Sequence, residues 1–273
     1  MRFHAIMMAS GFGHRFGSNK LLVPLEGKPL YRHVLDRLLS VAKTEPLDIT
    51  VVTQYEAIEQ ELAALCAAQG NPTLRELCAA HGDPARSELC VAQDDPVLPL
   101  YVVHNGEAAE GQAASIRLGT ASVLRRAGEN RLSVSSEMEQ PTGIPAQSAQ
   151  EKQAGKPESD PQNVAPESMR TQASPDDYLI FFVGDQPYLK EETIHHFLER
   201  LKAGKPLIQP MKCNGRFGNP VAFSMSLAEE LLALQGDVGG RVVIKAHADE
   251  VHPFEDVTPD ELRDMDRPED FSL

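Results

Sequence analysis

The stretch MMASGFGHRFGSNKLL, residues 7–22, contains the turn that decides how this chain is interpreted. The apolar run FHAIMMA, residues 3–9, predicts a buried β-strand, and a glycine-rich turn carrying Arg15 and Lys20 follows it directly. Glycines permit positive φ angles and close approach of a ligand, so the N–H groups of such a turn can cradle phosphate oxygens. Arg15 would add a planar fork and Lys20 a mobile point charge. A tight turn with two solvated cations is the alternative.

Neither common phosphate-binding pattern fits this turn. The G-x-G-x-x-G pattern begins correctly at Gly11 and Gly13, but the third glycine, Gly17, comes one residue late. The Walker pattern ends in Gly-Lys-Ser/Thr, whereas Lys20 is preceded by asparagine and followed by leucine. A third kind of phosphate loop is therefore indicated.

Length and charge limit the classes of protein to consider. The 273 residues are 41% hydrophobic and 24% charged, which is ordinary for a globular chain with a sizeable core. A net charge of −14 argues against a general binder of nucleic acid or anionic membranes, which needs a broad basic surface. No run approaches the roughly 20 apolar residues of a membrane span. We expect a cytoplasmic protein that begins with a strand and not with a signal peptide.

Strand-like and helix-like segments alternate along the chain. This alternation predicts an α/β fold, a mixed and mostly parallel sheet with helices on both faces. The expected strands are residues 3–9, 47–53, 99–105, 177–185, 206–211 and 219–224. The expected helices are residues 28–42, 55–68 and 226–235.

A tandem repeat interrupts this alternation at residues 61–96. Three twelve-residue blocks, ELAALCAAQGNP, TLRELCAAHGDP and ARSELCVAQDDP, each have Leu-Cys near the centre and a terminal proline. The cysteine spacing differs from that of zinc-binding patterns, so we interpret the repeat as a duplicated helical turn and not as a metal site.

A second interruption covers residues 127–176. This segment is rich in Ser, Gln, Glu and Pro and shows no hydrophobic periodicity. Such a composition buries too little apolar surface to offset the entropy lost on ordering. We expect one domain over residues 1–273 that carries the repeat and this disordered insertion.

Carboxylates in two further segments are candidate metal ligands. Asp185 follows the apolar strand in FFVGDQP, at the strand end where open α/β sheets bind ligands. Asp264 and Asp266 in DMDRPEDF are two residues apart, so in an extended segment they share a face. Mg²⁺ commonly takes one or two carboxylates together with phosphates. Turn formation at Asp185 and an acidic surface turn at residues 264–271 are the alternatives.

Taken in order, these segments resemble the motifs of the MobA-like nucleotidyltransferases. The matching segments are MASGFGHRFGSNKLLVPLEGKPL, GQAASIRLG, GDQP, FGNPVAFS, GDVGGRVVIK and DMDRPEDF. Within the family the sequence is most similar to the molybdenum cofactor cytidylyltransferases. The resemblance implies a Rossmann-like, three-layer nucleotidyltransferase domain.

The resemblance also implies roles for individual residues. Asn219 stands where the family commonly has histidine and Arg267 where it has threonine, which leaves the acceptor open. The implied roles are catalysis by Arg15, Lys20 and Asp185, nucleotide binding by Ala9, Ser10, Gly11, Gly13, Arg15, Gly17, Lys20 and Ser115, Mg²⁺ ligation by Asp185 and Asp266, and an acceptor side formed by Arg216, Asn219, Asp237 and Arg241.

The implied activity is transfer of CMP from CTP to the terminal phosphate of molybdopterin, with Mg²⁺ as cofactor and pyrophosphate as product. The implied partners are these small molecules and a molybdoenzyme or its chaperone. The chemistry suits the residues, because an ionised phosphate acceptor needs no nucleophile–base pair. The alternatives are GTP as donor, a sugar phosphate as acceptor, or a nucleotide-binding delivery protein without turnover.

Overall fold

The computed structural model describes residues 1–11, 19–68, 74–78, 87–91, 100–136 and 174–271. The chain forms two compact units, one of Met1–Val123 with Ser174–Leu273 and the other of Leu124–Ala173. In the second unit the described residues are 124–136, which belong to a helix that starts in the first unit. All features of the site lie in the first unit.

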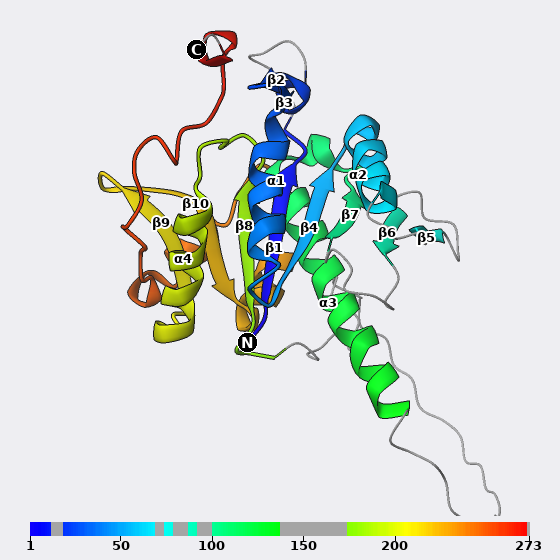
Figure 1. The fold of residues 1–273 in the computed structure, drawn as a ribbon. Helices are drawn as coiled ribbons and strands as arrows, with labels where there is room; N and C mark the ends of the chain where they lie inside the picture. Colours follow the sequence, from blue (N-terminus) through cyan, green and yellow to red (C-terminus); the bar gives the residue numbers. More distant parts are fainter. Residues whose placement is uncertain (12–18, 69–73, 79–86, 92–99, 137–173, 272–273) are drawn as a thin grey trace, which may run out of the picture. The chain divides into compact units, whose positions relative to one another are not determined.

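An eight-stranded sheet is the centre of the first unit (Figure 1). Its strand order is β5-β6-β7-β4-β1-β8-β10-β9, in which β6 and β10 run against the other strands. The mixed, mostly parallel sheet predicted from the sequence is confirmed. The strands are β1 (Phe3–Ala9), β4 (Leu47–Thr53), β5 (Leu74–Cys78), β6 (Ser87–Val91), β7 (Leu100–His104), β8 (Tyr178–Val183), β9 (Ile208–Cys213) and β10 (Arg216–Ser224), with a separate hairpin of β2 (Pro24–Leu25) and β3 (Lys28–Pro29).

Strand β1 is central because parallel neighbours flank it on both sides. Phe3 is paired with Leu47 of β4 and with Tyr178 of β8, and the register continues to Met8, opposite Val183. A parallel strand with both faces covered needs a nearly continuous apolar sequence, and FHAIMMA provides one.

Helices cover both faces of this sheet, as predicted. On one face Met7 belongs to an apolar cluster with residues of α1 (Leu30–Val41), α2 (Glu56–Ala68) and α4 (Glu191–Gly204). On the other face Ile6 lies against Gly119 of α3 (Gln112–Ser136). Two short helices, α5 (Ala228–Leu232) and α6 (Arg241–Ala246), follow β10. The result is the expected three-layer arrangement.

The interpretation of the repeat as helical turns is wrong for two of its three blocks. The first block continues α2 to Ala68, but the second and third contain strands β5 and β6, which pair antiparallel and extend the sheet beyond β7. The Leu-Cys sequence is thus helical in one block and extended in the others. Pairing with the edge of a sheet decides the conformation here, because local propensity is a weak determinant.

The predicted start of the insertion also needs correction. Helix α3 continues through Ser136, so residues 127–136, assigned to the disordered segment, are helical. Extending an existing helix avoids the cost of nucleating a new one, so the polar residues after the apolar part of α3 can also be helical. Residues 137–173 lie outside the described part of the chain, and their disorder stays a prediction. In the part of the chain that the structure describes, no helix is long and apolar enough to cross a membrane.

Replacing Gly119 with valine should destabilise the packing of α3 on the sheet. A Cβ atom at this position would overlap Cγ2 of Ile6 and lie 3.3 Å from Cγ2 of Val52. Overpacking of this kind costs about 1–3 kcal/mol, measurable as a lower free energy of unfolding in urea. Gly204→Val is the control, since Gly204 is also helical but exposed, with its nearest contact at 3.7 Å. Equal stability of the two variants would contradict the packing.

Candidate nucleotide-binding site

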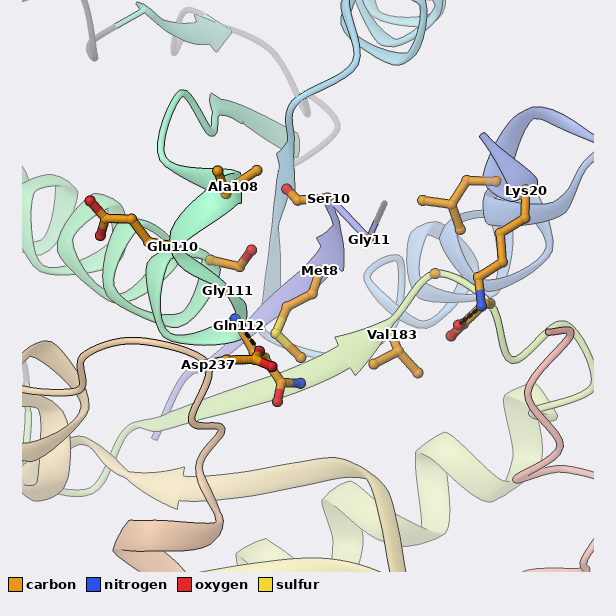
Figure 2. A pocket seen from close by; sticks show the side chains of 15 residues that line it. Met8, Ser10, Gly11, Lys20, Ala108, Glu110, Gly111, Gln112, Val183 and Asp237 are labelled. Atoms are coloured by element: carbon orange, nitrogen blue, oxygen red, sulfur yellow. Dashed lines mark hydrogen bonds and ion pairs between the residues drawn. The ribbon is translucent and has the colours of Figure 1, made fainter. Parts of the chain in front are cut away.

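A cavity of about 530 Å³ opens where strands β1 and β8 end (Figure 2). From β1 the chain crosses through α1 to β4 on one side, while β8 lies on the other. The cavity therefore lies at a topological switch point, the usual ligand position in open α/β sheets. It is lined by Met8, Ser10, Gly11, Lys20, Leu21, Ala108, Ala109, Glu110, Gly111, Gln112, Ser115, Val183, Gly184, Asp185 and Asp237.

The ammonium group of Lys20 connects two carboxylates from distant parts of the chain. Its Nζ atom is 2.6 Å from Oδ2 of Asp185 and 2.7 Å from Oδ1 of Asp266. Lys20 begins a short 3₁₀ helix that ends at Leu22, and the side chain of Asn19 caps this helix by accepting from the N–H of Leu21. The structure thus brings together Lys20, predicted to bind the triphosphate, and Asp185 and Asp266, predicted to bind Mg²⁺; these roles stay predictions.

Backbone hydrogen bonds fix both carboxylates in place. Gly184 donates its N–H to the carbonyl of Met8, which ties the turn after β8 to β1. Met265 donates to the carbonyl of Asp185 at 3.0 Å and so joins the C-terminal segment to the same turn. The Oδ2 atom of Asp270 accepts from the N–H groups of Asp266 and Arg267, which holds the C-terminal segment in its turn.

The surroundings shift the pKa of Lys20 and of the nearby Asp264. Burial alone would lower the pKa of Lys20, but the negative charges of Asp185 and Asp266 and the hydrogen bonds to them raise it above its usual value. Lys20 therefore stays a cation. Asp264 is exposed as a residue, yet its carboxyl group accepts from the buried amide of Gln186 at 2.9 Å. Desolvation and the nearby charge of Asp185 raise the pKa of Asp264.

Two carboxylates facing one point suit a divalent cation that also binds phosphate. The chemistry of Asp185 and Asp266 fits Mg²⁺, which keeps part of its water and takes few protein ligands when a nucleotide supplies others. Among the described residues there is no group of three or more His, Cys, Asp or Glu that could hold a metal by itself. Any cation bound by both carboxylates would have to share them with Lys20 or displace its Nζ atom.

The opposite wall of the cavity comes from the segment before α3, the first turn of α3 and the segment after α5. Ser115 is buried, and its Oγ accepts from Nδ2 of the buried Asn105 at 3.0 Å. Asp237 accepts from the N–H of Gln112 at 3.4 Å, at the start of α3. Gly111, with φ +98°, lies so close to Asp237 that a Cβ atom would be 2.6 Å from its Cα. The two segments thus pack backbone against backbone.

The start of the glycine-rich turn is held by residues that follow β4. Gln54 donates to the carbonyl of Ser10 at 2.5 Å, and the hydroxyl of Tyr55 donates to the carbonyl of Gly11 at 2.6 Å. The hydroxyl of Ser10 donates to the carbonyl of Val52. Ser10 and Gly11 line the cavity as expected, whereas Ala9 is fully buried and is not among the lining residues. Gly13, Arg15 and Gly17 lie outside the described residues.

The residues assigned to the acceptor side are spread over several elements. Asp237 lines the cavity, whereas Arg216, Asn219 and Arg241 are not among the residues that line it. Arg216 is exposed at the start of β10, Asn219 lies where the register of this strand shifts, and Arg241 is exposed at the start of α6. Their role stays a prediction.

Sequence reasoning did not single out several residues that line the cavity or support the residues that line it. Asn105, Glu110 and Gln112 are among them, as are Gln54 and Tyr55 behind the glycine-rich turn. A signal existed for Asn105, since it is a polar residue at the carboxyl end of an apolar strand. No comparable signal existed for Gln54 and Tyr55, whose contacts depend on the pairing of β4 with β1.

The sheet order, the switch-point cavity and the Lys20–carboxylate cluster define an α/β fold of the nucleotidyltransferase type. The family model described as the MobA-like NTP transferase domain matches residues 5–251. The chain therefore belongs to this family. The matched range ends before Asp266, so the C-terminal carboxylate joins the site through the structure and not through the family match.

Two curated relatives match short parts of the chain. One is the 2-C-methyl-D-erythritol 4-phosphate cytidylyltransferase of Rhodopirellula baltica, 38% identical over 66 residues, or 23% of this chain. The other is a probable molybdenum cofactor guanylyltransferase of Thermococcus sibiricus, 39% identical over 54 residues, or 20% of this chain. Each match spans 27% of the relative's length.

A solved structure with a similar fold is that of Rv0371c from Mycobacterium tuberculosis. Its TM-score is 0.54 at 17% identity, and the comparison covers 100% of this chain and 96% of that one. The same protein has been crystallised as a complex with manganese, with a TM-score of 0.50, 15% identity and coverage of 100% and 97%. At this identity the likeness establishes the fold alone.

Replacing Lys20 with methionine should tighten the binding of Mn²⁺ in the absence of nucleotide. The substitution removes a positive charge from between two carboxylates, which we expect to lower the Kd of Mn²⁺ by about tenfold. The measurement is the concentration of free Mn²⁺ by electron paramagnetic resonance. Lys28→Met is the control, because Lys28 pairs with Asp36. Unchanged or weaker Mn²⁺ binding by the Lys20 variant would show that the carboxylates do not form one cation site.

Proposed function

We propose that this chain is a Mg²⁺-dependent nucleotidyltransferase that transfers CMP from CTP to the terminal phosphate of molybdopterin and releases pyrophosphate. The observation that carries the proposal is the convergence of Lys20, Asp185 and Asp266 at a switch-point cavity. The membership of the family supports the reaction class.

The two curated relatives support different halves of the proposal. The name of one refers to cytidylyl transfer and that of the other to the molybdenum cofactor. The second name also refers to a guanylyl group, so GTP is the alternative donor. The first refers to a methylerythritol phosphate, so another organic phosphate is the alternative acceptor.

In the proposed reaction an oxygen of the acceptor's phosphate forms a bond to the α-phosphorus of CTP. The bond from this phosphorus to the oxygen that bridges to the β-phosphate breaks, and its electron pair leaves with pyrophosphate. The acceptor oxygen is already ionised near neutral pH, so no side chain has to remove a proton. The protein has to align the two substrates and offset their negative charges.

We assign each residue of the site a task in this reaction. Lys20 supplies a permanent positive charge for the phosphates. Asp185 and Asp266 would hold Mg²⁺, which when bound neutralises developing charge on the phosphate oxygens. Ser115 would line the part of the cavity that takes the nucleoside, and Asn105 would hold the Ser115 hydroxyl in place. Arg15 and the glycines that follow Gly11 would complete the triphosphate site.

The proposal is tested by pyrophosphate release from CTP, GTP, ATP and UTP with Mg²⁺, with and without molybdopterin. We expect release from CTP alone and only with molybdopterin present. Asp185→Asn should reduce turnover by about 100-fold or more, because it removes charge from the metal site. Asp256→Asn, an exposed surface change, should leave it unaltered.

Other outcomes of this assay identify the alternatives. Release from GTP would overturn the choice of donor and keep the reaction. Nucleotide binding without turnover, retained in Asp185→Asn, would favour a delivery protein. Folded protein that neither binds nor consumes any of the four nucleotides would contradict the proposal.

A further inference from the structure

Arg117 on α3 makes three polar contacts that the proposed reaction does not use. Its Nη2 atom is 2.9 Å from Oε2 of Glu107 and 2.8 Å from Oε2 of Glu110. Its Nη1 atom donates to the carbonyl of Leu234 at 2.9 Å. A planar guanidinium can serve three acceptors at once, which a lysine ammonium on a single stem cannot reproduce in this geometry.

These contacts join the two segments that form one wall of the cavity. Glu110 ends the 3₁₀ helix Ala108–Glu110 and lines the cavity. In the second segment Leu234 lies three residues before Asp237, which also lines the cavity. The same two segments meet again where Asp237 accepts from Gln112 and packs on Gly111. Arg117 is thus a second and charged connection between them.

Arg117 also determines where a negative charge lies. The Glu110 residue belongs to the cavity wall, and Figure 2 shows its carboxylate directed away from the other lining residues. The ion pair with Arg117 holds it there. Partial burial would lower the pKa of Arg117, but the hydrogen bonds to Glu110 and Glu107 raise it, so the guanidinium stays charged. Without this cation the carboxylate could turn into a cavity that has to accept a polyanion.

We infer that Arg117 is a positioning residue for nucleotide binding: it ties the 107–112 and 234–237 segments together and keeps the Glu110 carboxylate out of the cavity. The inference rests on the proposed function for the ligand, but the connection between the two segments does not. It predicts two separate effects of removing the guanidinium: faster amide exchange in the two segments, and weaker binding of the nucleotide.

The backbone effect is tested by hydrogen–deuterium exchange on the full chain without ligand. Arg117→Met should increase exchange at residues 107–112 and at 234–237 together, while strands β1 and β8 stay protected. Retained protection of the strands also shows that the variant is folded. Arg117→Lys should give the same pattern more weakly. Unchanged exchange in either segment would overturn the connection.

The electrostatic effect is tested by calorimetric titration with Mg²⁺–CTP. We expect Arg117→Met to raise the Kd of Mg²⁺–CTP by about tenfold, since the Glu110 carboxylate, no longer paired with Arg117, can turn into the cavity and repel the triphosphate. Glu110→Gln in the same background should restore most of the affinity. Glu107→Gln is the matched control, because Glu107 binds the same guanidinium but is not among the residues that line the cavity, and it should restore little.

The two tests separate failure of this inference from failure of the proposed function. Equal rescue by the two glutamine variants, or none, would overturn the placement of Glu110. If the unmodified protein binds none of the four nucleotides, the proposed function fails, and the exchange experiment still decides whether Arg117 connects the two segments.

Discussion

The ion pairing of Lys20 with Asp185 and Asp266 is the interaction on which the site depends. The carboxylates follow Lys20 by 165 and 246 residues, so the fold has to bring three distant segments to one point. Two carboxylates this close repel each other unless a cation lies between them, and Lys20 is that cation. Because any metal bound by both carboxylates competes with Lys20, the affinity of the site for metal is coupled to the position of this side chain.

The sheet provides the rigid base for this cluster. Parallel pairing of β1 with β4 and β8 places the ends of all three strands at one edge, from which the glycine-rich turn and the turn of Asp185 extend. The facing wall, in contrast, consists of irregular segments held by Arg117, by Asp237 and by close packing at Gly111. The cavity therefore has a cation at one end, and in the facing wall the Glu110 carboxylate is paired with Arg117 while the Asp237 carboxylate accepts from the N–H of Gln112.

The sequence was informative where a short segment determines its own structure. The strands at residues 3–9 and 47–53 have the same bounds in the structure, since runs dominated by apolar and β-branched residues favour a buried strand. The ordered motifs pointed to Lys20, Asp185 and Asp266 as site residues, but not to the ion pairs among them. The repeat was misassigned because its conformation depends on a neighbouring strand edge. The contact of Arg117 with Leu234 could not be foreseen because it joins segments that are 117 residues apart in the chain.

The most direct measurement is a crystal structure with Mn²⁺ and a non-hydrolysable CTP analogue, with the metal located by anomalous scattering. The account predicts Mn²⁺ in contact with Asp185 and Asp266, the triphosphate at the end of β1, and the ammonium group of Lys20 on a phosphate. A metal bound away from these two carboxylates, or a triphosphate outside the cavity between β1 and β8, would contradict it.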